Sequence, residues 1–212
     1  MNNDKSARGS VRAMVFDLGK VVFDFSFDSA VNSWAEAAGI DVAEVRKRYV
    51  WDGTFERYER GEIGLNEVHR NFVGQINREI PFDSFEKAWL DMFRNEIPGI
   101  REILGRLSPR FRLVALSNTN ADHARIWRRL YPEPLACFEK IFASNEIGTR
   151  KPEPRAFEIV MEYLGLDTGE VLFVDDYAEN VDAAERFGLR ALLFRDSAQL
   201  EGELQKEGLW PV

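Results

Sequence analysis

Hydrophobic positions along the chain follow two patterns. Short, uninterrupted apolar runs are typical of strands that are buried on both faces of a parallel sheet. They lie at residues 12–16, 111–116, 141–143, 171–174 and 190–194. Between the later runs, apolar side chains recur every three or four residues, which predicts helices over 121–130, 155–164 and 179–187. Because strands and helices alternate, we predict an α/β fold with a doubly wound parallel sheet.

The segment from residue 25 to residue 97 shows only the helical pattern and no run typical of a strand. Residues 27–38 have apolar side chains at helical spacing, and Gly39 follows as a helix-ending residue. Two capping-box spacings predict further helices, namely Asp41 with Glu44 and Asp83 with Glu86. The aromatic residues expected to form the core of this segment are Trp34, Phe85, Trp89 and Phe93. After Pro98, residues 99–107 form a helix that returns the chain to the sheet.

These patterns divide the chain into a tail and two domains. We predict a disordered tail at 1–10, because this stretch is polar and lacks the apolar core of a signal peptide. A core domain then comprises residues 11–24 and 98–212, and a helical cap domain comprises the insertion at 25–97.

Composition narrows the classes of partner. The net charge of −8 argues against a broad nucleic-acid or anionic-membrane surface. The single cysteine excludes an intrachain disulfide and fits a reducing compartment, and no apolar run is long enough to cross a membrane. We expect a cytoplasmic monomer or homodimer with no nucleic-acid or membrane partner.

Polar side chains follow four of the predicted buried segments. They are Asp17, then Ser117 with Asn118, then Lys151, then Asp175 with Asp176. Ligands of open α/β sheets bind at the carboxyl edge of the strands, so we expect these groups to converge on one site.

The residue types in this set indicate chemistry on phosphate. Three carboxylates form a hard oxygen site suited to Mg²⁺, and an aspartate can attack phosphorus as a nucleophile. A lysine, a hydroxyl and an amide can bind phosphate oxygens and stabilise their charge. Each group taken alone has a simpler explanation, such as a turn residue, a helix cap or a solvated loop charge. The ordered set favours the functional interpretation.

The four motifs FDLGKV, LSNTN, RKPEP and VDDYAEN resemble, in order, those of the haloacid dehalogenase (HAD) superfamily. The resemblance covers roughly residues 12–195 and implies a Rossmann-like core with an inserted helical cap. Together with YERGEIG, the motifs look most like the branch that holds bacterial α-D-glucose-1-phosphate phosphatase and the N-terminal phosphatase domain of soluble epoxide hydrolase.

This resemblance implies a role for each matching residue. Asp17 is the nucleophile, and the Gly19 carbonyl, Asp175 and Asp176 join it on Mg²⁺. Ser117, Asn118 and Lys151 bind the phosphate, and Asn180 supports the loop. Tyr58, Glu59 and Arg60, just before Gly61, are expected in a loop that faces the site, with Tyr58 and Arg60 contacting substrate. Lys20 is either an electrostatic aid or, with Asp24, a residue of a small hairpin beside the site.

One position departs from the family pattern. HAD phosphatases usually carry a second aspartate two residues after the nucleophile, which acts as general acid and base, but this chain has Gly19 there. Since such a group typically contributes about 10²–10⁴-fold in rate, either another group moves the proton or the leaving group needs little help. A sugar phosphate cleaved at its anomeric oxygen would fit the second case.

Two other functions stay open at this level. A 2-haloacid dehalogenase would use the same aspartate on carbon, but that branch usually has neutral residues where Asp175 and Asp176 stand. A phospho-ligand-binding protein with little turnover would fit the absence of the acid at Gly19. The two histidines, His69 and His123, are too isolated in sequence to suggest a zinc site.

Overall fold

The computed structural model describes residues 10–211, so the predicted tail at 1–10 lies, apart from Ser10, outside the described residues. The predicted α/β fold is confirmed. Five parallel strands form one sheet in the order β5-β4-β1-β6-β7. They are β1 (Ala13–Phe16), β4 (Arg112–Ser117), β5 (Lys140–Ala143), β6 (Val171–Asp175) and β7 (Arg190–Leu193). Each corresponds to one of the five apolar runs.

Both faces of this sheet are buried, which explains why its strands are apolar at consecutive positions. In β1, Met14 and Phe16 pack into one hydrophobic cluster, whereas Ala13 and Val15 pack into another on the opposite face. The first cluster is covered by α6 (Ile100–Leu107), α7 (Ala121–Leu130), α8 (Pro132–Leu135) and α12 (Ser197–Lys206). The second is covered by α9 (Ser144–Ile147), α10 (Pro154–Leu164) and α11 (Ala178–Phe187), with the short helix η2 (Thr168–Glu170) before β6.

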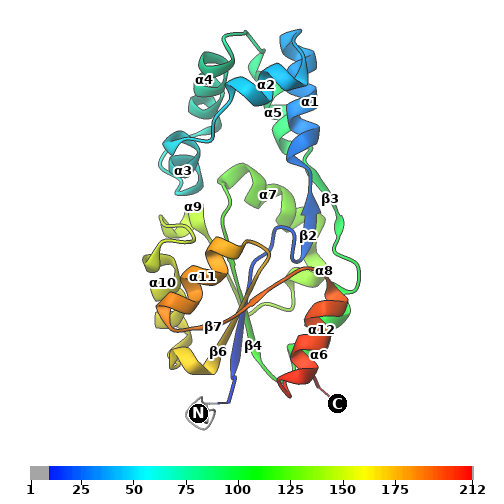
Figure 1. The fold of residues 1–212 in the computed structure, drawn as a ribbon, viewed down its shortest axis with the longest axis vertical. Coiled ribbons are helices and arrows are strands. Elements are labelled where there is room, and N and C mark those ends of the chain that lie inside the picture. The colour runs from blue at the N-terminus through cyan, green and yellow to red at the C-terminus, as the bar shows by residue number, and fades with distance from the viewer. Residues whose placement is uncertain (1–9, 212) are drawn as a thin grey trace, which may run out of the picture.

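A separate group of helices stands above the carboxyl edge of the sheet (Figure 1). It consists of α1 (Phe27–Ala38), α2 (Val42–Arg48), α3 (Gly53–Glu59), α4 (Leu65–Ile76) and α5 (Phe82–Leu90). These helices share their own hydrophobic cluster, in which the Trp34 ring stacks on Phe85 with centroids 4.6 Å apart. Asp41 begins α2 by accepting a hydrogen bond from the Ala43 amide.

Two short strands connect the helical part to the sheet, and the sequence did not indicate them. β2 (Phe23–Phe25) and β3 (Phe93–Glu96) pair antiparallel and run side by side between the two parts (Figure 1). The expectation of no strand in 25–97 is therefore wrong at both ends of the segment. A three- or four-residue strand that is exposed on one side is too short to show a period-two pattern.

Two local predictions in this region are also wrong. The helix expected from Asp83 begins at Phe82 after Pro81, and no side chain caps it. Phe93 lies in β3 and packs against the sheet-domain cluster instead of the cap core, with its ring 5.6 Å from that of Phe23. The cap core is otherwise built from the predicted residues Trp34, Phe85 and Trp89.

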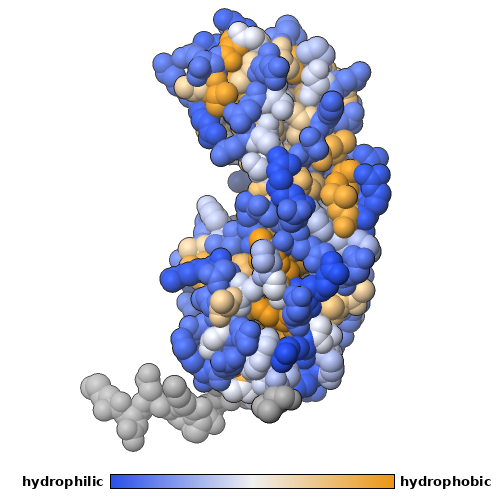
Figure 2. All heavy atoms as spheres, turned by 90° about the vertical axis from the view of Figure 1, so that its right-hand side faces the viewer, coloured by the Kyte–Doolittle hydropathy of each residue, from blue (hydrophilic) through white to orange (hydrophobic). Residues whose placement is uncertain are grey.

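The surface agrees with the acidic, polar composition. On the side that carries the two linking strands, it is mostly hydrophilic, with small hydrophobic groups at the narrow waist between the two parts (Figure 2). Within residues 10–211, no helix combines the length and the apolar character needed to span a bilayer.

Candidate active site

Asp17, Lys151 and Asp175 lie together at the carboxyl edge of the sheet. Asp17 follows β1, and its backbone N–H donates to the Val174 carbonyl of the neighbouring strand at 2.8 Å. Lys151 Nζ lies 2.7 Å from Asp17 Oδ1 and 2.6 Å from Asp175 Oδ2. Lys151 is 1% exposed and Asp175 0%, so these charges are out of contact with bulk water. Burial lowers the pKa of Lys151, but Asp17 and Asp175 outweigh it and raise that pKa, so the lysine stays charged.

Asp175 is held by groups from the start of the next helix. The Tyr177 N–H donates to Oδ1 at 2.8 Å, and Asn180 Nδ2 donates to both carboxylate oxygens at 3.1 Å. With Lys151 on Oδ2, both oxygens of Asp175 accept hydrogen bonds. Asp175 therefore has a fixed orientation, whereas the neighbouring Asp176 is partly exposed.

The three carboxylates can hold a metal ion. Asp17, Asp175 and Asp176 each offer an oxygen, and these oxygens lie within 4.8 Å of one another. Oxygen ligands of Mg²⁺ lie about 2.0–2.1 Å from the ion, so the spacing is close to that of ligands sharing one ion. Burial raises the pKa of Asp17 to about 7, and Asp175 and Asp176 add to the rise against the opposing effect of Lys151. One lysine thus leaves negative charge uncompensated here, and a divalent cation would balance it.

Ser117 is the last residue of β4, and Asn118 follows it beside this cluster. The Asn118 side chain brackets the backbone of Lys151, since Nδ2 donates to its carbonyl and Oδ1 accepts from its N–H, both at 2.8 Å. One amide N–H of Asn118 is left for a ligand. Among the described residues, no protein group hydrogen-bonds the hydroxyl of Ser117, which is 4% exposed. Ser144 fixes the same loop by exchanging hydrogen bonds with the backbone N–H and carbonyl of Thr119.

The turn after Asp17 brings Gly19 and Lys20 to the rim of the site. Lys20 has a left-handed backbone, with φ of 60°, and its ammonium pairs with Asp24 and lies 5.0 Å from the centre of the Phe25 ring. A Cβ added at Gly19 would lie 2.8 Å from Cε1 of Phe25. The Phe25 ring thus fills the space that a side chain at this position would enter.

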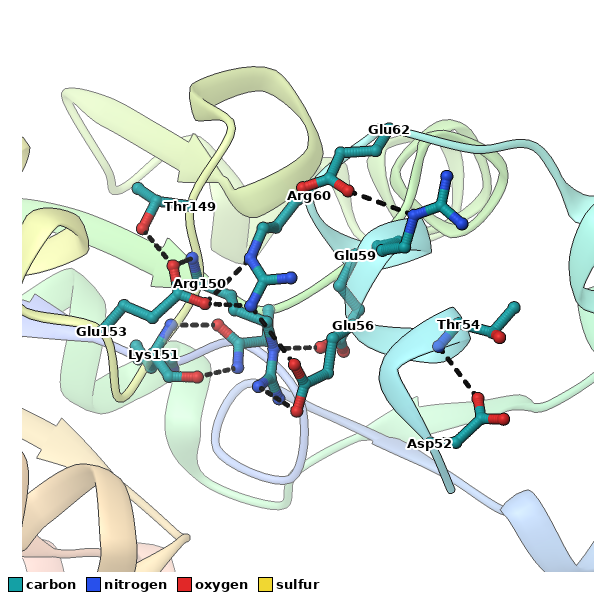
Figure 3. Close-up of polar contacts among 12 residues, drawn as sticks. Asp52, Thr54, Glu56, Glu59, Arg60, Glu62, Thr149, Arg150, Lys151 and Glu153 are labelled. Atoms are coloured by element: carbon teal, nitrogen blue, oxygen red, sulfur yellow. Dashed lines mark hydrogen bonds and ion pairs between the residues drawn. The ribbon is translucent and has the colours of Figure 1, made fainter. Parts of the chain in front are cut away.

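Tyr58 and Glu59, expected in a loop, are instead the last two residues of α3, and Arg60 caps the helix. Figure 3 shows Glu59 and Arg60 beside Arg150 and Glu153 of the sheet domain. Arg60 Nε donates to Glu153 at 2.9 Å, and Arg150 Nε donates to Glu59 at 2.6 Å. Tyr58 donates its hydroxyl proton to Asp122 at 2.7 Å. Substrate binding by Tyr58 and Arg60 stays a prediction, because the observed partners of both are protein groups.

Gly61 allows this close approach. A Cβ there would lie 2.5 Å from the carbonyl oxygen of Asn145, and its φ of 72° is one that other residues rarely adopt.

Sequence reasoning missed several residues of this region. Arg150 and Glu153 lie in the third motif beside Lys151, and this closeness in sequence could have indicated that they lie near the site. His123 lies in α7, where its ring stacks on Trp89 and its Nε2–H donates to the Trp89 carbonyl at 2.9 Å. Burial lowers the pKa of His123 to about 4, so the ring is neutral at neutral pH. Its place, six residues beyond the serine of LSNTN, gave no indication of contact with the cap.

Two curated proteins resemble this chain over nearly its whole length. It is 27% identical over 202 residues to a D-ribitol-5-phosphate phosphatase of Bacteroides thetaiotaomicron, an alignment that covers 92% of this chain and 97% of the relative. It is 26% identical over 209 residues to a sesquiterpene phosphatase of Aspergillus oryzae, covering 92% and 95%.

A solved structure shows the same fold. The HAD family enzyme of B. thetaiotaomicron, solved with magnesium and inorganic phosphate, superposes with a TM-score of 0.74. It shares 23% sequence identity, and the superposition covers 89% of this chain and 96% of that one. At this identity the likeness concerns the fold.

The family match covers most of the sequence. Residues 11–188 match the family of haloacid dehalogenase-like hydrolases, and all four predicted motifs lie inside this range. The chain belongs to the haloacid dehalogenase-like hydrolases.

Proposed function

We propose that this enzyme is a Mg²⁺-dependent phosphatase of a small phosphorylated molecule and acts through an aspartyl-phosphate. The contact that carries the proposal is the buried Asp17–Lys151–Asp175 cluster, whose carboxylates together with Asp176 can hold a cation. Such a site places a nucleophile, a fixed positive charge and the ligands of a metal ion next to one another.

The geometry supports a role for each of these residues. Asp17 is held at the end of a buried strand, so one carboxylate oxygen can be presented to phosphorus in a fixed position. Lys151 is oriented by Asn118 and Asp175, and its ammonium can stabilise the charge on the phosphoryl oxygens. The free Ser117 hydroxyl and the remaining Asn118 N–H can donate to the same oxygens.

Asp17, Asp175, Asp176 and, by resemblance, the Gly19 carbonyl would hold the metal. A bound Mg²⁺ would neutralise charge on the phosphoryl group and lower the repulsion that it meets among the carboxylates.

The relatives support this class of reaction. One relative named above is a phosphatase of a polyol phosphate, and the other is a sesquiterpene phosphatase. The two names have the phosphatase reaction in common, but they differ in the alcohol. The anomeric sugar phosphate that the sequence suggested stays a prediction, because the residues that bind the phosphate do not identify the alcohol of the substrate.

Replacing the nucleophile gives the first test. Asp17→Asn should lower kcat for p-nitrophenyl phosphate by at least about 10⁴-fold, because an amide cannot form the acyl-phosphate. Asp28→Asn, on the exposed surface of α1, serves as the control and should retain activity. Turnover retained in Asp17→Asn would end the nucleophile assignment.

Metal removal separates the alternatives. EDTA should abolish phosphatase activity and Mg²⁺ should restore it, whereas a 2-haloacid dehalogenase reaction would survive EDTA. Binding of phosphate in Mg²⁺ without turnover of any ester would instead indicate the phospho-ligand-binding function.

A further inference from the structure

A pocket of about 210 Å³ adjoins the phosphate-binding motif. Gly19, Ser117 and Asn118 are among its lining residues, so it lies next to the place where phosphate is expected. Its other walls are mostly aromatic and come from the linking strands β2 and β3, from the cap, and from α7 with the loop before it. The apolar residues that matter here are Phe25, Phe27, Trp51, Phe55, Trp89 and Met92. The leaving alcohol of the substrate would lie in this pocket.

Beyond Ser117 and Asn118, which are expected to bind the phosphate, several polar groups that line this pocket already have hydrogen-bond partners within the protein. Asn120 Oδ1 accepts from the His123 N–H, and Glu59 accepts from Arg150. His123 Nε2–H is used by the Trp89 carbonyl. A sugar or polyol would lose its hydrogen bonds to water here and regain few of them, which costs binding free energy.

One buried donor in this lining lacks a partner. Among the described residues, Trp89 Nε1–H is buried without a hydrogen-bond acceptor. Since it also interacts with the Tyr58 hydroxyl, it offers a ligand at most one hydrogen bond, which is too few for the several hydroxyls of a polyol.

The size of the pocket suits an aromatic ring system. An apolar cavity of about 150 Å³ takes up benzene in an engineered protein, so about 210 Å³ accommodates one ring or two fused rings. Neighbouring aromatic walls also favour a flat ring, because edge-to-face and stacked contacts add to simple burial.

The missing acid points to the same class of alcohol. Gly19 has no side chain, and the ring of Phe25 blocks the space beside it, so protonation of the leaving oxygen from this position is excluded. A phenolic oxygen ionises with a pKa of about 10 and can depart as the anion, unlike an aliphatic alkoxide. The absence of a general acid therefore slows the hydrolysis of an aryl ester less than that of an alkyl ester.

We propose that the substrate is the phosphate monoester of an apolar phenol, bound with its ring in the pocket between Gly19, Trp51 and Trp89. This inference rests on the proposed phosphatase activity. An Asp17 oxygen forms a bond to phosphorus while the bond between phosphorus and the aryl oxygen breaks. The electron pair of the broken bond leaves with the aryl oxide, which takes a proton from water. Water then attacks the phosphorus of the aspartyl-phosphate and gives a proton to the hydroxide that the first step left in solution. The bond to Asp17 breaks, which restores the carboxylate and releases inorganic phosphate.

The test compares esters that differ in polarity and leaving group. We would measure kcat/KM in Mg²⁺ for phenyl phosphate, 2-naphthyl phosphate, cyclohexyl phosphate, D-glucose 1-phosphate and D-ribitol 5-phosphate. The two aryl esters should exceed each of the others by about 100-fold or more, since cyclohexyl phosphate lacks the good leaving group and the sugars lack the apolar ring. Equal or better turnover of either sugar ester, or of cyclohexyl phosphate, would overturn the substrate class while leaving the phosphatase intact. Turnover of none of the five would remove the proposed function and this inference with it.

Trp51 allows a test in the protein itself, because its side chain is 46% exposed and its loss should leave the fold intact. Trp51→Ala should raise KM for 2-naphthyl phosphate about 10-fold, because the ring loses its apolar contact with the indole. The inhibition constant of inorganic phosphate should change less than about twofold, because phosphate does not contact this side chain. Tyr163→Ala, an exposed aromatic residue outside this pocket, is the matched control and should leave both values unchanged. An unchanged KM in Trp51→Ala, or an equal rise in the inhibition constant of phosphate, would contradict ring binding here.

Discussion

Gly19 and Phe25 together define the chemistry that this site lacks. The family's usual acid is absent at position 19, and the structure adds that Phe25 occupies the space where its side chain would lie. The pair acts as a unit, because restoring the acid alone would force an aspartate against an aromatic ring.

We predict that Gly19→Asp combined with Phe25→Ala raises kcat/KM for simple alkyl phosphates by about 10²-fold. The same double variant should change kcat/KM for p-nitrophenyl phosphate less than about threefold, because that leaving group needs no proton. Steady-state kinetics on the two esters provide the measurement, with Phe25→Ala alone as the control. Equal effects on the two esters would show that leaving-group protonation is not what Gly19 removes.

His123 makes the stability of the fold depend on pH. Its pKa is lowered to about 4 by burial, whereas an unfolded histidine titrates near 6.5. The unfolded chain therefore takes up a proton first as the pH falls. The stability from keeping this ring neutral is complete above about pH 6.5 and is lost as the pH falls towards 4.

Urea unfolding between pH 7.5 and pH 4.5 should show this loss. His123→Gln should flatten the decline by up to about 3 kcal/mol, the equivalent of the difference between the two pKa values. Arg129→Gln, an exposed residue on the same helix, is the control. An unchanged pH profile in His123→Gln would show that the pKa of His123 is the same in the folded and unfolded chains.

At the scale of elements, the contact between α3 and the segment before α10 joins cap and core. Arg150 pairs with Glu59, which is 8% exposed and whose pKa is raised by burial despite this arginine. Removing one partner of such a pair leaves a buried charge without compensation, which costs more than removing both.

We predict that Arg150→Gln lowers the free energy of unfolding by about 2 kcal/mol, and that adding Glu59→Gln recovers part of this loss. Chemical denaturation of the two single variants and the double variant measures the coupling. Arg155→Gln removes an exposed pair with Glu162 and should change stability by less than about 0.5 kcal/mol. Additive losses in the double variant would contradict a coupled pair.

For the whole molecule, metal binding should be visible as stability. The folded chain gathers three carboxylates that the unfolded chain does not, so Mg²⁺ binds the folded state preferentially. At about 100 times its Kd, a ligand of this kind stabilises a protein by about 2.7 kcal/mol.

We therefore expect Mg²⁺ to raise the Tm by several degrees and EDTA to reverse the rise. Asp176→Asn should abolish most of this shift, because it removes a partly exposed ligand while leaving the Lys151–Asp175 contact in place. Asp182→Asn, an exposed acid on α11, is the matched control. A Mg²⁺-dependent shift of full size in Asp176→Asn would place the ion elsewhere.

The pattern of apolar and polar positions was enough to predict the sheet, the helices that cover it and the edge at which the site lies. Strands covered on both faces are apolar at consecutive positions, so β1 and β4 to β7 could be recognised, with Asp17, Ser117 and Asp175 at the carboxyl ends of β1, β4 and β6. The contacts of these residues depend on the three-dimensional packing and could not be predicted from the pattern. The strands β2 and β3 are too short to carry a pattern, and the pairing of Arg150 with Glu59 joins positions 91 residues apart. The position of the Phe25 ring beside Gly19 likewise depends on how β2 packs against the turn after Asp17. Periodicity records which side of an element is buried, whereas the partner of each side chain is set by the packing of elements that are distant in the chain.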